Sequence, residues 1–269
     1  MKKNIILIVI ESLRYDRLFG SHIPTEYKMS KFLELARDST TFHKCISVSN
    51  SSWMSAAAML MGNDICYHHN KDFYWTCPYD YATVSNKYSN PLFSILKENG
   101  FETFALLCPN SDFGRECGRD IFHHVIDPDT SKKVSTMWGS NEKNIIHCRN
   151  KKNIVTKLKS LYKKNNGENL ACLIWGHDDH FAFTPNGPMD RLACYKKTSD
   201  DLGEIFSFLK NNNYYDNTDI YVIGDHGDTH YAFSEVSNDF CLQHGTTPFH
   251  TTTHVPLMVK SHHLRREES

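Results

Sequence analysis

The sequence predicts an α/β fold in which a mostly parallel, doubly wound sheet carries helices on both faces. Short runs rich in Ile, Val and Leu recur along the chain, and helical patterns separate them. Most of these runs are almost continuously apolar, as strands covered on both faces must be. We expect strands at residues 4–10, 101–108, 169–175, 218–224 and 255–259.

The intervening helices are predicted from apolar residues at 3.6-residue spacing. In the first, Met29, Phe32, Leu33 and Ala36 share one face, and packing against the sheet explains them fully. The polar, weakly periodic stretches 63–90 and 109–150 are expected to form irregular excursions over the sheet edge. No internal repeat is present, so we expect a single domain over residues 1–269. The expected helices cover residues 29–38, 53–61, 91–99, 154–164 and 189–212.

The composition excludes several classes of protein. The 30 Lys+Arg and 31 Asp+Glu residues give a net charge of −1, which removes the electrostatic case for binding nucleic acid or a membrane surface. The nine cysteines are scattered without a Cys-x-x-Cys pair, which favours free thiols in a reducing cytoplasm. The first apolar run ends at Glu11 without a cleavage site after it. We therefore expect a cytoplasmic protein without an export signal or a membrane anchor.

Carboxylates and histidines follow three of the predicted strands directly. Glu11 follows the first strand, residues 176–180 (Gly-His-Asp-Asp-His) follow the third, and residues 225–228 (Asp-His-Gly-Asp) follow the fourth. In a doubly wound sheet, ligands bind outside the carboxyl ends of the strands. One charge at a strand end is common, but such residues at three ends of one sheet edge predict a metal site.

Residues 51–62 (SSWMSAAAMLMG) allow two interpretations. Serines before a run of small, helix-forming residues are typical of a capped helix. A serine at a helix N-terminus can also be a nucleophile, because the free backbone N–H groups and the helix dipole receive an anion there. A bound divalent cation would lower the pKa of its hydroxyl.

Five segments, in order along the chain, carry a resemblance to a known family. They are residues 4–14, 52–59, 215–228, 243–249 and 253–257. On these segments the chain resembles the alkaline-phosphatase/sulfatase superfamily. Within it, the chain is most similar to the catalytic domains of lipid A phosphoethanolamine transferases and lipoteichoic-acid synthases. The resemblance implies an alkaline-phosphatase-like catalytic domain.

The resemblance also implies a metal site and a nucleophile. Glu11, Asp225 and His226 would bind a divalent metal, and the oxygen of Ser52 would complete its ligands. Three oxygens and one imidazole suit Mn²⁺ or Zn²⁺, with Mg²⁺ and Ca²⁺ as alternatives.

The resemblance places further residues near the substrate. His180 corresponds to a histidine that contacts the transferred group, and His244 would lie at the substrate or at a second, weaker metal. Both are candidates for the catalytic acid or base. His254 is either a site residue or a structural one. Arg14 would either clamp phosphate oxygens or form a surface ion pair with Asp16.

Several departures from the sulfatase pattern bear on the chemistry. Sulfatases convert a Cys or Ser of a C/S-x-P-x-R motif to formylglycine, but Met54 and Ala56 stand where that motif has Pro and Arg. Gly176 stands four residues before His180, where a fully dimetallic site would have Asp. We therefore expect one tight metal and an unmodified Ser52 that attacks phosphorus. Since the chain ends soon after its last strand, we also expect it to lack the C-terminal subdomain typical of sulfatases.

Together these features predict a metal-dependent phosphoester hydrolase or phosphotransferase that forms a phosphoserine at Ser52. The expected substrate is a small soluble phosphoester or a phosphorylated saccharide. One alternative is a sulfatase or phosphonate-ester hydrolase. Another is a catalytically dead, metal-stabilised binding protein.

Overall fold

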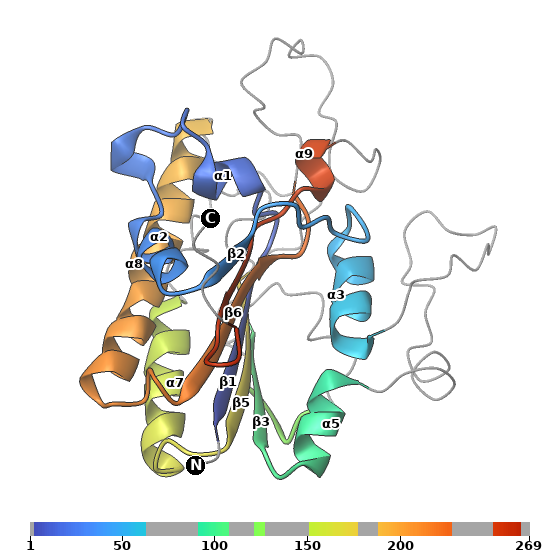
Figure 1. The fold of residues 1–269 in the computed structure, drawn as a ribbon, viewed down its shortest axis with the longest axis vertical. Helices are drawn as coiled ribbons and strands as arrows, with labels where there is room; N and C mark the ends of the chain where they lie inside the picture. The colour runs from blue at the N-terminus through green and yellow to red at the C-terminus, as the bar shows by residue number, and fades with distance from the viewer. Residues whose placement is uncertain are drawn as a thin grey trace, which may run out of the picture.

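The structure is a computed structural model that describes residues 3–62, 91–107, 121–126, 151–176, 188–227 and 250–264. Its centre is a seven-stranded sheet with the order β2-β7-β6-β1-β5-β3-β4 (Figure 1). The strands are β1 (Asn4–Ile10), β2 (Thr40–Phe42), β3 (Glu102–Leu107), β4 (His124–Ile126), β5 (Leu170–Gly176), β6 (Thr218–Gly224) and β7 (Leu257–Lys260).

The sheet is mostly parallel, as predicted. β1 pairs in parallel with β5 and β6, and β3 pairs in parallel with β4 and β5. β7 runs antiparallel to β6, and the short edge strand β2 runs antiparallel to β7. β1 is therefore central, and its carboxyl end lies between those of β5 and β6.

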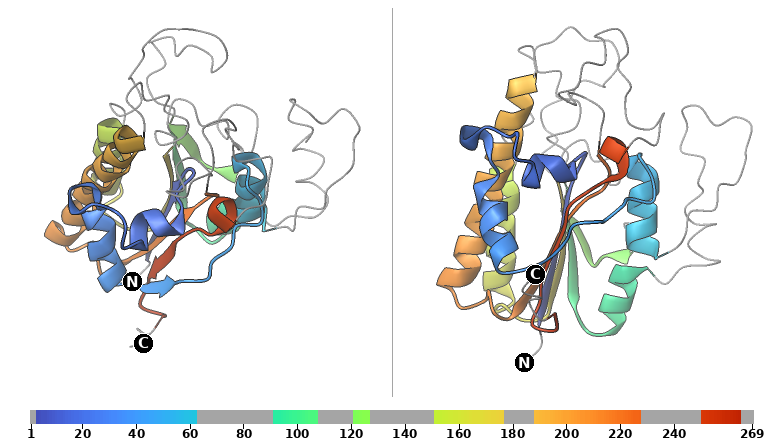
Figure 2. Two further views of the ribbon diagram at one scale, coloured as in Figure 1. Left: turned by 90° about the horizontal axis from the view of Figure 1, so that it is seen from above. Right: turned by 45° about the horizontal axis from the view of Figure 1, so that its top comes forward.

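Helices cover both faces of the sheet (Figures 1 and 2). One face carries α2 (Ser30–Arg37), α7 (Lys151–Lys164) and α8 (Pro188–Asn211), and the other carries α3 (Ser52–Met61) and α5 (Leu92–Glu98). Two helices of one turn, α1 (Tyr15–Phe19) and α9 (His250–Thr253), lie at the carboxyl edge of the sheet, and a 3-10 turn spans Thr25–Tyr27. Within the described ranges, no helix has the length and apolar character needed to cross a membrane.

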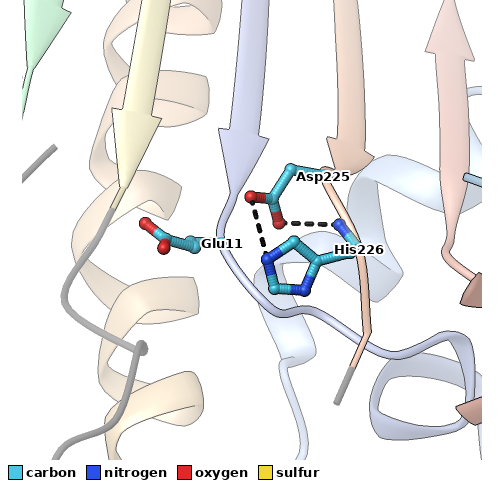
Figure 3. A group of neighbouring side chains, drawn as sticks. All are labelled: Glu11, Asp225 and His226. Carbon is cyan, nitrogen blue, oxygen red and sulfur yellow. Dashed lines mark hydrogen bonds and ion pairs between the residues drawn. The ribbon is translucent and has the colours of Figure 1, made fainter. Parts of the chain in front are cut away.

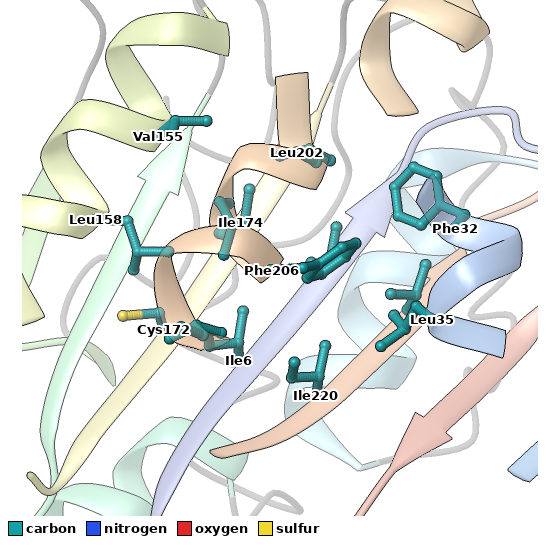
Figure 4. Packing of buried hydrophobic residues seen from close by; sticks show 14 of the residues in the cluster. Ile6, Phe32, Leu35, Val155, Leu158, Cys172, Ile174, Leu202, Phe206 and Ile220 are labelled. Atoms are coloured by element: carbon teal, nitrogen blue, oxygen red, sulfur yellow. The ribbon is translucent and has the colours of Figure 1, made fainter. Parts of the chain in front are cut away.

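Each face of the sheet has its own hydrophobic core. Ile6, Ile8 and Ile10 of β1 belong to the cluster that packs against α2, α7 and α8 (Figure 4), whereas Val9 belongs to the cluster on the other face. Successive side chains of a strand point to opposite faces, so an apolar run such as β1 supplies both cores. This explains why the strand is almost continuously apolar.

All five predicted strands and all five predicted helices are present, with ends that differ by a few residues. The sequence patterns missed β2 and β4, which have three residues each, and the short α1 and α9. β4 lies inside the stretch 109–150, which was expected to be irregular, and it extends the sheet beside β3. The other expected excursion, 63–90, lies outside the described residues.

Candidate active site

Glu11 directly follows β1, and Asp225 and His226 directly follow β6 (Figure 3). Ile10 pairs with Gly224, so Glu11 and Asp225 leave neighbouring strands at the same level of the sheet. Ligand atoms of all three residues lie within 4.8 Å of one another. The residues Glu11, Asp225 and His226 are 2%, 1% and 0% exposed, respectively, so they form a buried cluster of two carboxylates and one imidazole.

The two carboxylate oxygens of Asp225 have different surroundings. Oδ1 accepts the backbone N–H of Ser12 at 2.8 Å and that of His226 at 2.7 Å. Oδ2 is buried, lies 3.5 Å from His226 Nε2, and has no hydrogen-bond partner among the described residues. Because a buried oxygen without a partner is unfavourable, Oδ2 is available to a ligand.

The backbone sets the tautomer of His226. Nδ1 lies 2.6 Å from the carbonyl oxygen of Gly227, which can only accept a hydrogen bond. Nδ1 therefore carries a proton, and Nε2 is the ring nitrogen that faces the cluster. Metal-binding histidines are commonly oriented in this way: one ring nitrogen binds the metal, and the other donates a hydrogen bond to a backbone carbonyl oxygen.

Ser52 completes the cluster from the first turn of α3. Its hydroxyl donates to Glu11 Oε1 at 3.0 Å and lies 2.9 Å from His226 Nε2. The preceding residue, Ser51, makes no side-chain capping bond to the helix. The segment was open to two interpretations, a serine cap or a serine nucleophile at a helix N-terminus. The structure shows no side-chain cap from Ser51, and it places the Ser52 hydroxyl at the helix N-terminus beside the acidic cluster.

The charge of the cluster fits a divalent cation. Glu11 and Asp225 place two carboxylates beside one imidazole in a buried site, and two neighbouring buried carboxylates are unfavourable without a cation. Carboxylate oxygens, one imidazole nitrogen and a serine oxygen are suitable donors for Mn²⁺ or Zn²⁺. The residues present therefore fit the metal site that the resemblance implies.

A chain of serine hydroxyls links the cluster to α3. Ser47 Oγ donates to the carbonyl oxygen of Asp225 at 2.5 Å and lies 3.0 Å from Ser55 Oγ, one helical turn after Ser52. Ser55 is 1% exposed, and its Oγ also lies 3.3 Å from the carbonyl oxygen of Ser49. This network holds the start of α3 against the end of β6. No sequence signal pointed to Ser47, because Asp225, whose carbonyl oxygen it binds, is 178 positions away in the chain.

Arg14 forms an ion pair with Asp16, which was one of its two predicted roles. Nε donates to Oδ1 at 2.7 Å and Nη2 to Oδ2 at 2.5 Å, so the pair is bidentate. The pair was expected at the surface, but Arg14 is only 5% exposed. Its Nη1 is buried without a hydrogen-bond partner among the described residues.

His254 lies outside the acidic cluster. Its ring stacks on Tyr15 with centroids 4.3 Å apart, and its Nε2 lies 2.8 Å from the carbonyl oxygen of His43. His180 and His244, the two expected acid–base residues, lie outside the described residues.

Comparisons with known proteins agree with this architecture. A family model described as Sulfatase matches residues 3–268. No curated protein matches the sequence significantly. Among solved structures, the lipoteichoic acid synthase LtaP from Listeria monocytogenes is 13% identical with a TM-score of 0.64, over 99% of this chain and 66% of LtaP.

Two further solved structures are periplasmic domains. The C-terminal domain of phosphoethanolamine transferase EptC from Campylobacter jejuni is 14% identical with a TM-score of 0.61, over 96% of this chain and 79% of that one. The corresponding domain of EcEptC from Escherichia coli, in complex with Zn, is 11% identical with a TM-score of 0.61, over 96% and 72% of the two chains. At these identities the likeness concerns the fold. The chain spans just under two thirds of the length of LtaP.

Proposed function

The chain belongs to the sulfatase family, and from this premise we propose that it is a metal-dependent phosphoester hydrolase or phosphotransferase with Ser52 as its nucleophile. Membership confirms the superfamily resemblance and makes the chain one of a group of hydrolases and transferases. The observation that carries the proposal is the position of the Ser52 hydroxyl. It lies at the N-terminus of α3, within hydrogen-bond distance of both Glu11 and His226.

Glu11, Asp225, His226 and the Ser52 oxygen would hold a divalent cation, for which we propose Mn²⁺ or Zn²⁺. When bound, the cation lowers the pKa of the serine hydroxyl and offsets negative charge on the substrate. A Zn complex of EcEptC supports a divalent metal in this superfamily. The arrangement of two carboxylates and one imidazole within 4.8 Å supports it in this chain.

The chain's own residues carry the remaining steps of the proposed reaction. Glu11 accepts the hydrogen bond of Ser52 and so directs the serine oxygen toward phosphorus. Ser52 releases its proton as Oγ bonds to phosphorus, the bond between phosphorus and the ester oxygen breaks, the ester oxygen leaves with a proton, and a phosphoserine forms. The first-turn N–H groups of α3 favour the negative charge of the phosphoryl oxygens. Water or an acceptor hydroxyl then takes the phosphoryl group and restores Ser52.

His180 and His244 remain our candidates for proton transfer to the leaving oxygen and from the incoming hydroxyl. We propose a small soluble phosphoester or a phosphorylated saccharide as the substrate. Arg14 is engaged with Asp16, so we assign phosphate binding to the α3 terminus in preference to Arg14.

Replacing Ser52 tests the proposal. We expect Ser52→Ala to lower kcat on phosphate mono- or diesters by at least about a thousandfold, because the attacking oxygen is gone. Ser51→Ala is the matched control: it is the same change one residue earlier, at a side chain that makes no capping bond, and it should keep most activity. Full activity of Ser52→Ala, measured with Mn²⁺ or Zn²⁺ present, would refute the nucleophile assignment.

A sulfatase is the second candidate because the matching family carries that description. It would require Ser52 as formylglycine, and Met54 and Ala56 stand in place of the Pro and Arg of the conversion motif. Mass spectrometry of the peptide that contains Ser52 distinguishes the two functions. An intact serine together with no turnover of aryl sulfate supports the phosphoester reaction, whereas formylglycine supports the sulfatase.

A further inference from the structure

Ser12 has an unusual backbone for its residue type. Its φ is 57°, in the left-handed region, and the other described residues with positive φ are Asn or Gly. The left-handed conformation is unfavourable for a residue with a Cβ, unless surrounding contacts hold it. Ser12 is fully buried and directly follows Glu11, so the strain lies beside the proposed metal. Strain that persists at such a position points to a function.

The left-handed turn directs the Ser12 N–H toward the end of β6. This N–H and that of His226 both donate to Asp225 Oδ1, at 2.8 and 2.7 Å. A carboxylate oxygen has two lone pairs in its plane, and both are occupied here. Oδ2 is left without a hydrogen-bond partner among the described residues, so Asp225 offers one oxygen to a cation.

Tyr195 of α8 holds this turn from the other side. Its hydroxyl donates to the carbonyl oxygen of Ser12 at 2.9 Å, across 183 residues of sequence. Tyr195 is 2% exposed, so water does not compete for the bond. The next carbonyl, that of Leu13, lies 2.5 Å from where a Cβ on Gly224 would stand, so the turn also packs closely against β6.

From these contacts we infer that Tyr195 is a positioning residue for the metal. Its hydroxyl keeps Ser12 in the left-handed turn. This turn keeps the Ser12 N–H on Asp225 Oδ1, so that Asp225 can bind the metal through Oδ2 alone. The inference rests on the proposed function, because it concerns the same cation site. Without the hydroxyl, the Ser12 carbonyl loses its partner and the strained backbone relaxes. Its N–H then leaves Asp225 Oδ1, and both Asp225 and the adjacent Glu11 lose their fixed orientation.

The experiment compares two variants that each remove one buried tyrosine hydroxyl from the full-length chain. Tyr195→Phe removes the bond to Ser12. Tyr162→Phe is the matched control, since Tyr162 is fully buried and its hydroxyl bonds to Thr218 at the start of β6, the opposite end of that strand from Asp225. The dissociation constants of Mn²⁺ and Zn²⁺ are measured by competition with a chelator, and thermal unfolding is measured in EDTA.

We expect Tyr195→Phe to weaken metal binding by about tenfold or more, as changes to groups that orient metal ligands commonly do. Tyr162→Phe should bind metal like the wild type, although both variants lose a buried hydrogen bond and unfold at somewhat lower temperature in EDTA. A merely structural role of Tyr195 would lower the unfolding temperature without changing the affinity.

A double variant tests the role of strain. Glycine adopts the left-handed region freely, so Tyr195→Phe combined with Ser12→Gly should recover part of the lost affinity. Equal affinities of Tyr195→Phe and Tyr162→Phe would overturn the inference and leave the proposed function intact. A double variant that binds no more tightly than Tyr195→Phe would overturn it as well. A wild-type chain that binds neither metal would overturn both the inference and the proposed function.

Discussion

At the scale of single residues, burial decides what a side chain can do. Arg14 could have faced either a phosphate or Asp16, and the structure places it in a bidentate ion pair with Asp16 at 5% exposure. A short-range partner two residues away holds the guanidinium in place. Arg14 Nη1 and Asp225 Oδ2 are both buried without a hydrogen-bond partner among the described residues. Of these two atoms, Oδ2 belongs to the cluster of ligand atoms with Glu11 and His226, where a cation can bind.

Cys172 is a buried thiol whose reactivity follows from its surroundings. It lies on β5 without solvent exposure, and burial raises its pKa from 9.0 to about 12. Because the thiolate is the reactive form, iodoacetamide at pH 8 should leave Cys172 unmodified in the native protein. The half-buried Cys45 should react faster. Peptide mass spectrometry before and after unfolding in urea checks this, and equal labelling of the two cysteines in the native protein would contradict it.

The same shift gives Cys172 a pH-dependent effect on stability. Its folded pKa lies above the unfolded value of 9.0, so the unfolded chain loses this proton first. The stabilising contribution is fully present below pH 9 and is lost as the pH rises toward 12. Between pH 9 and 11, the free energy of unfolding of the wild type should therefore fall more steeply than that of Cys172→Ala.

At the scale of elements, α9 covers the loop that follows β6. The N–H of Gly227 donates to the carbonyl oxygen of Thr252 at 2.8 Å. A Cβ on Gly227 would lie 2.0 Å from the carbonyl oxygen of Thr251 and 3.2 Å from Arg14 Cγ. The glycine is therefore required by the close approach of the helix backbone.

Gly227→Ala should accordingly destabilise the protein by about 2 to 4 kcal/mol, because the α9 backbone must move away. It should also weaken metal binding, since the Gly227 carbonyl orients His226. Gly62→Ala is the matched control: Gly62 has a φ of 68° and no atom within 4 Å of the added Cβ. It should lose only about 1 kcal/mol from backbone strain. Urea unfolding measures the stability of both variants. Equal losses of stability in Gly227→Ala and Gly62→Ala would contradict the expected clash with α9.

At the scale of the whole molecule, the sheet brings the site together. Glu11 and Asp225 are 214 positions apart by their numbers, and the parallel pairing of β1 with β6 places them side by side. α3 then brings Ser52 over the same strand ends from the face opposite α8. Because the cluster joins three elements, a cation bound there stabilises the tertiary structure.

Metal should therefore raise the unfolding temperature of the whole protein. At a free concentration about 100 times the dissociation constant, binding contributes about 2.7 kcal/mol, which corresponds to about 5 to 10 °C for a chain of this size. EDTA should reverse the shift. Asp225→Asn keeps the shape of the side chain but removes its charge, so its unfolding temperature should not respond to Mn²⁺ or Zn²⁺. A wild-type response no larger than that of Asp225→Asn would contradict a metal site here.

By itself, the sequence predicted the long strands and helices, the two-sided character of the sheet, and a metal site at the carboxyl ends of the strands. These features follow from local patterns, because an apolar run or a residue at a strand end is visible without its neighbours. The family resemblance, and not the local pattern, added Glu11, Ser52, Asp225 and His226 as one set of ligands. The cytoplasmic location and the phosphoester substrate stay predictions.

Only the tertiary structure decided the rest. Three-residue edge strands such as β2 and β4 are too short to show a pattern, and their pairing with β7 and β3 defines them. The left-handed turn at Ser12 is held by Tyr195 and Asp225, which lie 183 and 213 residues away. Such contacts leave no local trace in the sequence, because each partner alone has the appearance of an ordinary buried residue.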